Sequence, residues 1–444
     1  MKVAAGLDCR GVPISTASNT CLNAYEDALT AFNTYCGDPA LIIDKVLTDH
    51  PDFVMGHILR CHVHASLWQR SAIPEVRARL NVLNDYTHIS NERERCHIAA
   101  LWNWTVGNWK GMRSHLTKIL SDYPRDLLAL QVCHLLDFFH GDRKNLRDRI
   151  AYALSSWSKN DNGISFIHGM YAFGLEECGE YRSSEENGRK ALEIRSDNCW
   201  ARHAVAHVME MECRQQEGIE FMRESEKSWS QHNNIFSHHN WWHTALFLID
   251  QGQMTEVLNI YDAAIAPDLD SKQFLLADAV SLLWRLYLIG EDVGNRWEII
   301  ADAYENSGEA GFYAFNDMHA MLAYTVCGRE SAIQNLIYDV QKVVQESSSN
   351  ALMERLVGLP AIEAIASFGQ GDYAQCSKLV FSLLNHAHVF GGSHAQRDLL
   401  NLTLIEAAIR DQNKKMVSIL LRERRKTRPS CPFSLKIEER AQIV

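Results

Sequence analysis

Two consecutive stretches of the sequence, residues 165–198 and 199–233, repeat one pattern of small residues with a shift of 34 positions. Each stretch has an alanine, Ala172 or Ala206, which stands seven residues before a turn and a second helical pattern. The turns recur along the chain at Gly107, Gly141, Gly179, Cys213 and Gly252. Their spacings are 34, 38, 34 and 39 residues. A chain that repeats in this way folds into a stack of similar units, not into separate compact domains.

The repeated unit has the sequence features of two helices. Apolar residues recur with a helical period, no alternating strand pattern is found, and only nine prolines occur. A repeat length near 34 residues is that of tetratricopeptide repeats, in which each unit is a helical hairpin. We therefore predict an all-α fold, an α-solenoid of about eleven tetratricopeptide-like helical hairpins. We expect this solenoid over residues 20–428, between an N-terminal extension (1–19) and a C-terminal tail (429–444), and its irregular spacing allows it to curl into a closed superhelix.

Composition limits the classes of function. The chain of 444 residues has a net charge of −11, and its basic run at residues 422–428 ends the last predicted helix, where cations suit the helix dipole. Nucleic-acid binding needs lysines and arginines gathered on one face, so we expect no nucleic-acid partner. The N-terminus lacks the apolar core of a signal peptide, and no stretch approaches about 18 uninterrupted apolar residues. We therefore expect a soluble, cytoplasmic protein with no membrane partner, and its 12 cysteines, which form no CxxC pair, are expected to be reduced thiols.

Several segments of the sequence are more specific than the generic tetratricopeptide repeat pattern. They read NCWARHAVAHVMEMECRQQEGIEFM, HHNWWHTALFLIDQGQMTEVLNIYD, GLDCRGVPISTAS, FNDMHAMLAY and GGSHAQRD, and together they are drawn from nearly the whole chain. In these segments the sequence resembles the tetratricopeptide repeat protein 38 family. The resemblance implies a soluble, cytosolic α-solenoid, and it brings no established reaction with it.

Histidines and aromatic residues fall on the face that tetratricopeptide repeats use for binding. In such repeats the first helix of each hairpin lines a concave groove through its second, fifth, ninth and twelfth residues, which lie within about 40° of their mean direction. In two successive hairpins these groove positions carry Trp200, His203, His207, Glu210, His239 and Trp242, with His243 one residue away. A groove of this kind suits a small or extended ligand with apolar and hydrogen-bonding parts.

The spacing of the histidines leaves further interpretations open. His203 and His207 are four residues apart, as are His239 and His243, and such pairs place two imidazoles on one helix face. Neighbouring first helices could bring all four together as ligands of a divalent metal, with Glu210 as a carboxylate. Against this, His-x-x-x-His is an unspecific pattern, and no Glu follows the first His as in zinc proteases. Two other interpretations explain the same spacing: the histidines contact an organic ligand, or they are hydrogen-bonded in the core.

Two later segments could complete a site. His319 lies at the start of one predicted first helix, and His394 and Arg397 lie at the start of the last hairpin, where polar residues also act as helix caps. If the solenoid closes into a ring, all three would face the His203–His207 pair. Arg397 could then hold a carboxylate or phosphate bidentately.

Three functions are consistent with these residues. The first is a binding protein whose concave groove holds a small-molecule or peptide ligand, and the second is an adaptor that binds another protein. The third is an enzyme in which His203, His207 and Glu210, with or without a metal, perform acid–base chemistry, because histidine titrates near neutral pH. The usual role of this repeat class favours binding, whereas the polar residues at groove positions favour the enzyme. A closed bore would indicate a small molecule, and an open groove would indicate a peptide.

Overall fold

Packing divides the chain into two units, and each is described by itself. The first comprises Met1–Val205 and Lys227–Phe236, and the second comprises Ala206–Glu226 and Ser237–Val444. The first boundary between them falls inside one helix, α11 (Cys199–Met211). The coordinates are a computed structural model, which describes residues 6–16, 18–231, 233–267, 269 and 272–443.

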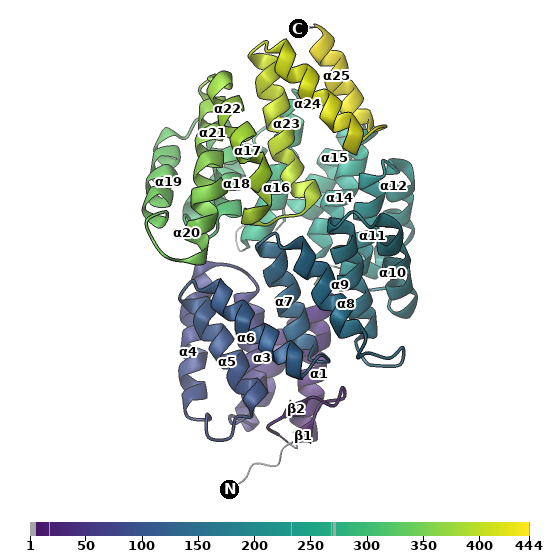
Figure 1. The fold of residues 1–444 in the computed structure, drawn as a ribbon, viewed down its shortest axis with the longest axis vertical. Helices are drawn as coiled ribbons and strands as arrows, with labels where there is room; N and C mark the ends of the chain where they lie inside the picture. The colour runs from purple at the N-terminus through teal and green to yellow at the C-terminus, as the bar shows by residue number, and fades with distance from the viewer. Residues whose placement is uncertain (1–5, 17, 232, 268, 270–271, 444) are drawn as a thin grey trace. The chain divides into compact units, whose positions relative to one another are not determined.

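The first unit begins with a short antiparallel β-hairpin and continues as paired helices (Figure 1). Strand β1 (Gly6–Leu7) pairs with β2 (Pro13–Ile14), with Gly6 opposite Ile14 and Leu7 opposite Pro13. The helices that follow are α1 (Asn19–Thr34), α2 (Pro39–Asp49), α3 (Val54–Ala65), the 3-10 turn η1 (Arg70–Ala72), α4 (Ile73–Asn84), α5 (Glu92–Thr105), α6 (Trp109–Asp122), α7 (Leu127–Phe139), α8 (Arg143–Leu154), α9 (Ile164–Glu177) and α10 (Tyr181–Ile194). A short helix, α13 (Glu226–Trp229), lies at the second passage between the units.

The second unit continues the same helical pattern and contains the later part of α11. Its helices and helical turns are α12 (Gln215–Glu224), α14 (Ser237–Asp250), α15 (Met254–Ile260), η2 (Tyr261–Ile265), α16 (Gln273–Leu288), α17 (Arg296–Ser307), α18 (Ala314–Val326), α19 (Glu330–Val343), α20 (Ser349–Met353), η4 (Glu354–Gly358), α21 (Leu359–Gly369), α22 (Tyr373–Leu383), η5 (Leu384–Phe390), α23 (His394–Arg410), α24 (Lys414–Thr427) and α25 (Pro432–Ile443). Residues 429–444, predicted as a C-terminal tail, thus contain α25, and Cys431, Phe433 and Ile437 there are buried.

Consecutive helices form the predicted hairpins. The pairs are α1/α2, α3/α4, α5/α6, α7/α8, α9/α10, α11/α12, α14/α15, α16/α17, α18/α19, α21/α22 and α23/α24. Over the described residues these eleven pairs confirm the predicted all-α solenoid of tetratricopeptide-like hairpins. None of the described helices has the length and the apolar character to cross a membrane.

The small residues of the repeat act as the sequence predicts. Ala172, Ala206 and Ala245 have no exposed surface, because each lies where neighbouring helices cross closely. Gly179 has a φ of 80°, and Cys213, which replaces glycine in the series of turns, has a φ of 58°. A residue with a side chain pays about 1–2 kcal/mol in this left-handed region, so Cys213 keeps the turn geometry at the cost of backbone strain.

Close packing of a side chain against a glycine fixes the position of α14, which carries two of the histidines. A Cβ atom placed on Gly218 of α12 would lie only 2.5 Å from Cζ of Phe247 on α14. Glycine is therefore required where α12 crosses α14, since any larger residue would push the two helices apart. Phe247 lies one turn after His243 on α14, so this contact holds the same side of the helix that carries the histidines.

Candidate metal centre

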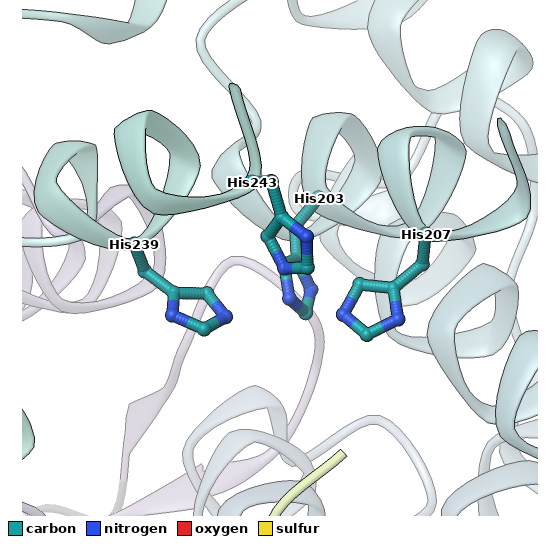
Figure 2. Close-up of side chains that lie close together, drawn as sticks. All are labelled: His203, His207, His239 and His243. Carbon is teal, nitrogen blue, oxygen red and sulfur yellow. The ribbon is translucent and has the colours of Figure 1, made fainter. Parts of the chain in front are cut away.

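Histidines of two helices, α11 and α14, form the candidate site (Figure 2). His203 and His207 lie one turn apart on α11, and His239 and His243 lie one turn apart on α14. His207, His239 and His243 each offer one ring nitrogen, and these three atoms lie within 4.8 Å of one another. His203, His207 and His243 are at most 2% exposed, and the side chain of His239 is 13% exposed. The helical spacing of four residues, read from the sequence, is what aligns each pair.

Three of these histidines belong to the second unit, and we call His207, His239 and His243 the histidine cluster. The ring centroids of His207 and His243 are 4.3 Å apart, and those of His239 and His243 are 4.8 Å apart. His203 lies on the first-unit part of the same continuous helix, where its ring centroid is 4.9 Å from that of Phe173. The cluster therefore stands on residues of a single unit, with His203 one turn further along α11.

Carboxylates stand behind two rings of the histidine cluster. Nδ1 of His239 lies 2.9 Å from Oδ2 of Asp278 on α16, and Nδ1 of His243 lies 3.3 Å from Oε2 of Glu210 on α11. With each Nδ1–H donating to its carboxylate, the lone pair of both rings lies on Nε2. Metal-binding histidines have this arrangement, because the carboxylate fixes the tautomer and raises the basicity of the ligating nitrogen.

The charge state of His243 also suits a ligand. Burial, together with the neighbouring histidine rings and the charge of Arg285, holds the pKa of His243 well below its usual range. The imidazole is therefore neutral at pH 7, which is the form that binds a metal ion.

These donors fit a divalent transition metal. Imidazole nitrogens are preferred by Zn²⁺, Cu²⁺, Ni²⁺ and Fe²⁺, and three of them with a further open position form a common catalytic zinc site. Two nitrogens on opposite sides of an ion, each about 2.1 Å from it, are about 4.2 Å apart. A spread of up to 4.8 Å can be closed by small rotations of the rings. His207, His239 and His243 would hold the ion, with His203 as a fourth candidate.

Trp242 lies beside the histidine cluster, in the core of the second unit. It is fully buried, its ring is stacked on His239 with centroids 5.3 Å apart, and its Nε1–H donates to Oγ of Ser281 at 2.8 Å. The guanidinium of Arg285 lies over the same ring, 5.2 Å from the centroid. Trp242 thus orients His239 and supports Arg285 through its ring.

His319 is buried in α18. Its Nδ1–H donates to the carbonyl of Phe315 at 2.7 Å, and burial lowers the pKa of His319 to about 4. The ring is therefore neutral, with its lone pair on Nε2. His319 is electrostatically coupled to Asp278 and Arg285, which lie on α16.

His394 and Arg397 are half-buried at the start of α23, where Ser393 caps the helix in a capping box with Gln396. The guanidinium of Arg397 is directed to the carbonyls of Gly391 and Gly392, and its Nη2 lies 3.4 Å from Nδ1 of His394. These contacts hold the loop that precedes α23.

Trp200 lies in an aromatic cluster of the first unit. Its Nε1–H donates to the hydroxyl of Tyr35 at 3.2 Å, and its ring centroid is 4.8 Å from that of His134 and 5.0 Å from that of Phe173. Since Trp200 is 4% exposed, its apolar surface is used in packing.

Three residues near the histidine cluster escape the sequence analysis, namely Asp278, Arg285 and Arg428. Asp278 and Arg285 are buried on α16, whose sequence QFLLADAVSLLWRLYL is otherwise almost wholly apolar. With Ser281 they stand at positions i, i+3 and i+7, so they form a polar stripe on an apolar helix. That stripe could have been recognised in the sequence, because charged residues are rarely buried unless they are paired. Arg428, which donates to Glu210 at 3.0 Å, carries no such signal.

Comparison with known proteins bears on the fold. No family model matches the chain. Among solved structures, the human IFIT1 dimer with m7Gppp-AAAA is similar over 94% of this chain and 99% of that chain, with 14% sequence identity and a TM-score of 0.44. The human IFIT1 dimer with PPP-AAAA is similar over 88% of this chain and 90% of that chain, with 14% identity and a TM-score of 0.42.

These neighbours contradict one expectation drawn from the sequence, that the chain has no nucleic-acid partner. Both IFIT1 structures hold a capped or triphosphate oligonucleotide on a helical fold of this kind. The expectation was wrong because it used the net charge of −11, and the total charge of a chain does not determine the charge lining one surface of it. The fold itself, an α-helical solenoid of tetratricopeptide type, follows from the eleven helical hairpins of the described residues.

Proposed function

We propose that this protein binds a divalent transition-metal ion through His207, His239 and His243. The observation that carries the proposal is the convergence of their ring nitrogens within 4.8 Å in one unit of the structure. Asp278 and Glu210 add the hydrogen-bonded carboxylates that orient metal-binding histidines.

Burial supports a small ligand at this site in preference to a peptide. His207 and His243 have no exposed surface, whereas a peptide groove keeps its binding side chains open to solvent until the peptide arrives. An ion and a small molecule completing its coordination need little space. Of the alternatives that the sequence leaves open, a metal centre with a small-molecule ligand is therefore the one we propose, and His203 is its further candidate ligand.

The second candidate function is a metal-dependent enzyme. The observation that favours it is the donor set itself, since three histidines leave a coordination position for water or substrate. A bound metal would supply Lewis acidity and a water of lowered pKa at that position. Glu210 and Asp278, which lie within hydrogen-bond distance of Nδ1 of His243 and His239, would keep these histidines in the ligating tautomer.

Elemental analysis tests the metal proposal. We expect the purified chain, dialysed against Zn²⁺, Ni²⁺, Cu²⁺ or Co²⁺ and then against buffer, to retain about one equivalent of one of these ions. His207→Phe and His239→Phe, which keep an aromatic ring but remove the donor, should lose it, whereas His88→Gln, at an exposed histidine, should not. Retention of no metal by the wild-type chain, or equal retention by all variants with intact circular dichroism, would refute the proposal.

The proposal also includes a family and a cellular location. The segments around α11, α14 and α23 support membership of the tetratricopeptide repeat protein 38 family, because they match beyond the generic repeat. A cytoplasmic location is supported by the cysteine pattern, and imaging of the tagged full-length chain would test it.

A further inference from the structure

Arg285 is a buried cation that lies beside the histidine cluster. It is 4% exposed, and its two terminal nitrogens donate to backbone carbonyls, Nη1 to Ser281 at 2.8 Å and Nη2 to Ala395 at 2.6 Å. Among the residues that the structure describes, no carboxylate lies within ion-pair distance of its guanidinium. Burial accordingly lowers the pKa of Arg285 to about 10, a sign that its charge is poorly compensated.

The carboxylates around Arg285 are already engaged elsewhere. Glu210 accepts from Arg428 at 3.0 Å, and Asp278 accepts from His239 at 2.9 Å. Asp398 is held by Arg424 through two hydrogen bonds of 2.8 and 3.0 Å. Imidazole ligands bring no negative charge, so a divalent ion in the cluster would add to the positive charge of Arg285. Buried charge of one sign is costly unless a counter-charge accompanies it.

His319 adds a second polar group that lacks a partner. Its Nδ1–H is used by the carbonyl of Phe315, so its Nε2 carries a lone pair, and this buried atom has no hydrogen-bond partner among the described residues. Buried acceptors are nearly always satisfied, by protein, by water or by a ligand. Arg285 lies over the ring of Trp242, whose centroid is 4.8 Å from that of His243. On its other side Arg285 donates to Ala395, three residues after Gly392, and Gly392 packs on the ring of Phe315, whose centroid is 4.3 Å from that of His319. The three groups therefore lie in one neighbourhood of the second unit.

We propose that the site beside the histidine cluster receives a small hydroxylated anion, a carboxylate or a phosphate ester, whose charge Arg285 binds and whose hydroxyl donates to Nε2 of His319. This inference rests on the proposed metal centre for the second contact of the anion, which is the open coordination position. Arg285 suits the anion because a guanidinium presents paired donors to carboxylate or phosphate oxygens. The neutral His319 ring can only accept at Nε2, so it selects a ligand with a donor at that point.

Isothermal titration calorimetry of the full chain tests the inference, with metal content measured on the same samples. The probes are two matched pairs, malate with succinate and glycerol phosphate with ethyl phosphate, titrated into metal-loaded and metal-free protein. The pairs distinguish a carboxylate from a phosphate, and within each pair only one member has the hydroxyl. Arg285→Met removes the charge. Arg296→Met is the matched control, because Arg296 also lies over an aromatic ring, that of Tyr261, but forms an ion pair with Asp262.

We expect the hydroxylated member of one pair to bind metal-loaded protein, and Arg285→Met to weaken that binding about ten-fold or more with metal content unchanged. Arg285→Lys, which keeps the charge, should bind with intermediate affinity if Arg285→Met does not fold. Failure of the wild-type chain to retain metal would refute the metal centre. Anion binding to the metal-free protein would then test the contacts with Arg285 and His319 by themselves. Binding of none of the probes, equal binding by Arg285→Met, or no preference for the hydroxyl would overturn the inference.

Discussion

Glu210 connects the histidine cluster to a buried arginine of the C-terminal segment. Its Oε2 faces Nδ1 of His243 at 3.3 Å, and its Oε1 accepts from Arg428 at 3.0 Å. Glu210→Gln keeps the size of the side chain but removes the charge that orients the ring. We expect it to weaken metal binding about 10- to 100-fold, as measured by competition with a chromophoric chelator. Glu212→Gln, at an exposed residue two positions away, should leave the affinity unchanged, and an unaltered affinity in Glu210→Gln would contradict the role given to this carboxylate.

Among single residues, the sequence predicts the histidines that would bind the metal better than the carboxylates and arginines that contact them. His207, His239 and His243 can be found because helical spacing of four residues is a local pattern, readable without knowing the fold. Asp278 reaches His239 across 39 residues of sequence and Arg428 reaches Glu210 across 218, and no local periodicity encodes such contacts. The orienting carboxylates and the buried arginines therefore emerge only from tertiary packing.

His134 on α7 makes stability depend on pH. Both its ring nitrogens are buried without a hydrogen-bond partner among the described residues, and burial, with the charge of Arg149, lowers its pKa to about 3. The unfolded chain takes up a proton at this residue below about pH 6.5, whereas the folded chain does not until pH approaches 3. The contribution of His134 to stability is therefore complete above pH 6.5 and is lost as the pH falls through this window, by up to about 1.4 kcal/mol per pH unit.

Replacing His134 by phenylalanine should remove this dependence. The ring contacts with Trp200 and Phe173 can be kept, because phenylalanine is also flat and aromatic. Urea unfolding at pH 7.5, 6.5 and 5.5 should show a smaller acid loss in His134→Phe than in the wild type. His88→Gln, at an exposed histidine, is the control and should retain the wild-type loss. Parallel losses in wild type and His134→Phe would show that the acid sensitivity arises elsewhere.

The positions of the helices and turns can be predicted from the sequence, because the residues that determine them are close together in the chain. The turn series that defines the repeat reappears as left-handed backbone at Gly179 and at Cys213, the one position without glycine. Helix starts follow in the same way from capping residues, as in the capping box of Asn91 and Glu94 at α5. The division of the chain into two units leaves no such trace, because a regular repeat continues through α11 without a break.

Cys213 offers a test of the repeat at the scale of one element. Its φ of 58° strains a residue with a Cβ atom, and glycine would remove about 1–2 kcal/mol of strain while adding about 0.4–1 kcal/mol of unfolded-state entropy. We expect Cys213→Gly to raise the free energy of unfolding by roughly 0.5–1 kcal/mol, as measured by chemical denaturation. Cys178→Gly, at a right-handed helix end with a φ of −89°, lacks that strain and should not be stabilised. Destabilisation of Cys213→Gly would show that the position is not equivalent to the glycines of the other turns.

For the whole molecule, the position of the histidine cluster predicts where a metal stabilises the chain. His207, His239 and His243 all belong to the second unit, and α14 is joined to α16 through the His239–Asp278 and Trp242–Ser281 hydrogen bonds. A ligand at one hundred times its Kd stabilises the state that binds it by about 2.7 kcal/mol. In a solenoid, stability is transmitted chiefly between neighbouring repeats, so this gain should decline with distance along the chain.

Hydrogen exchange followed by mass spectrometry, with and without the bound metal, measures this decline. We expect amides of α14 and α16 to exchange about 10- to 100-fold more slowly with metal, and those of α3 to α5 in the first unit to change little. His207→Phe, which removes one ligand, should abolish the slowing in α14 and α16, which assigns it to the cluster. Slowing of equal size in α3 to α5 would mean that the two units unfold as one cooperative body, and slowing confined to exposed surface helices would place the metal outside the histidine cluster. The exchange pattern thus distinguishes a local metal centre in the second unit from a metal that stabilises the whole repeat array.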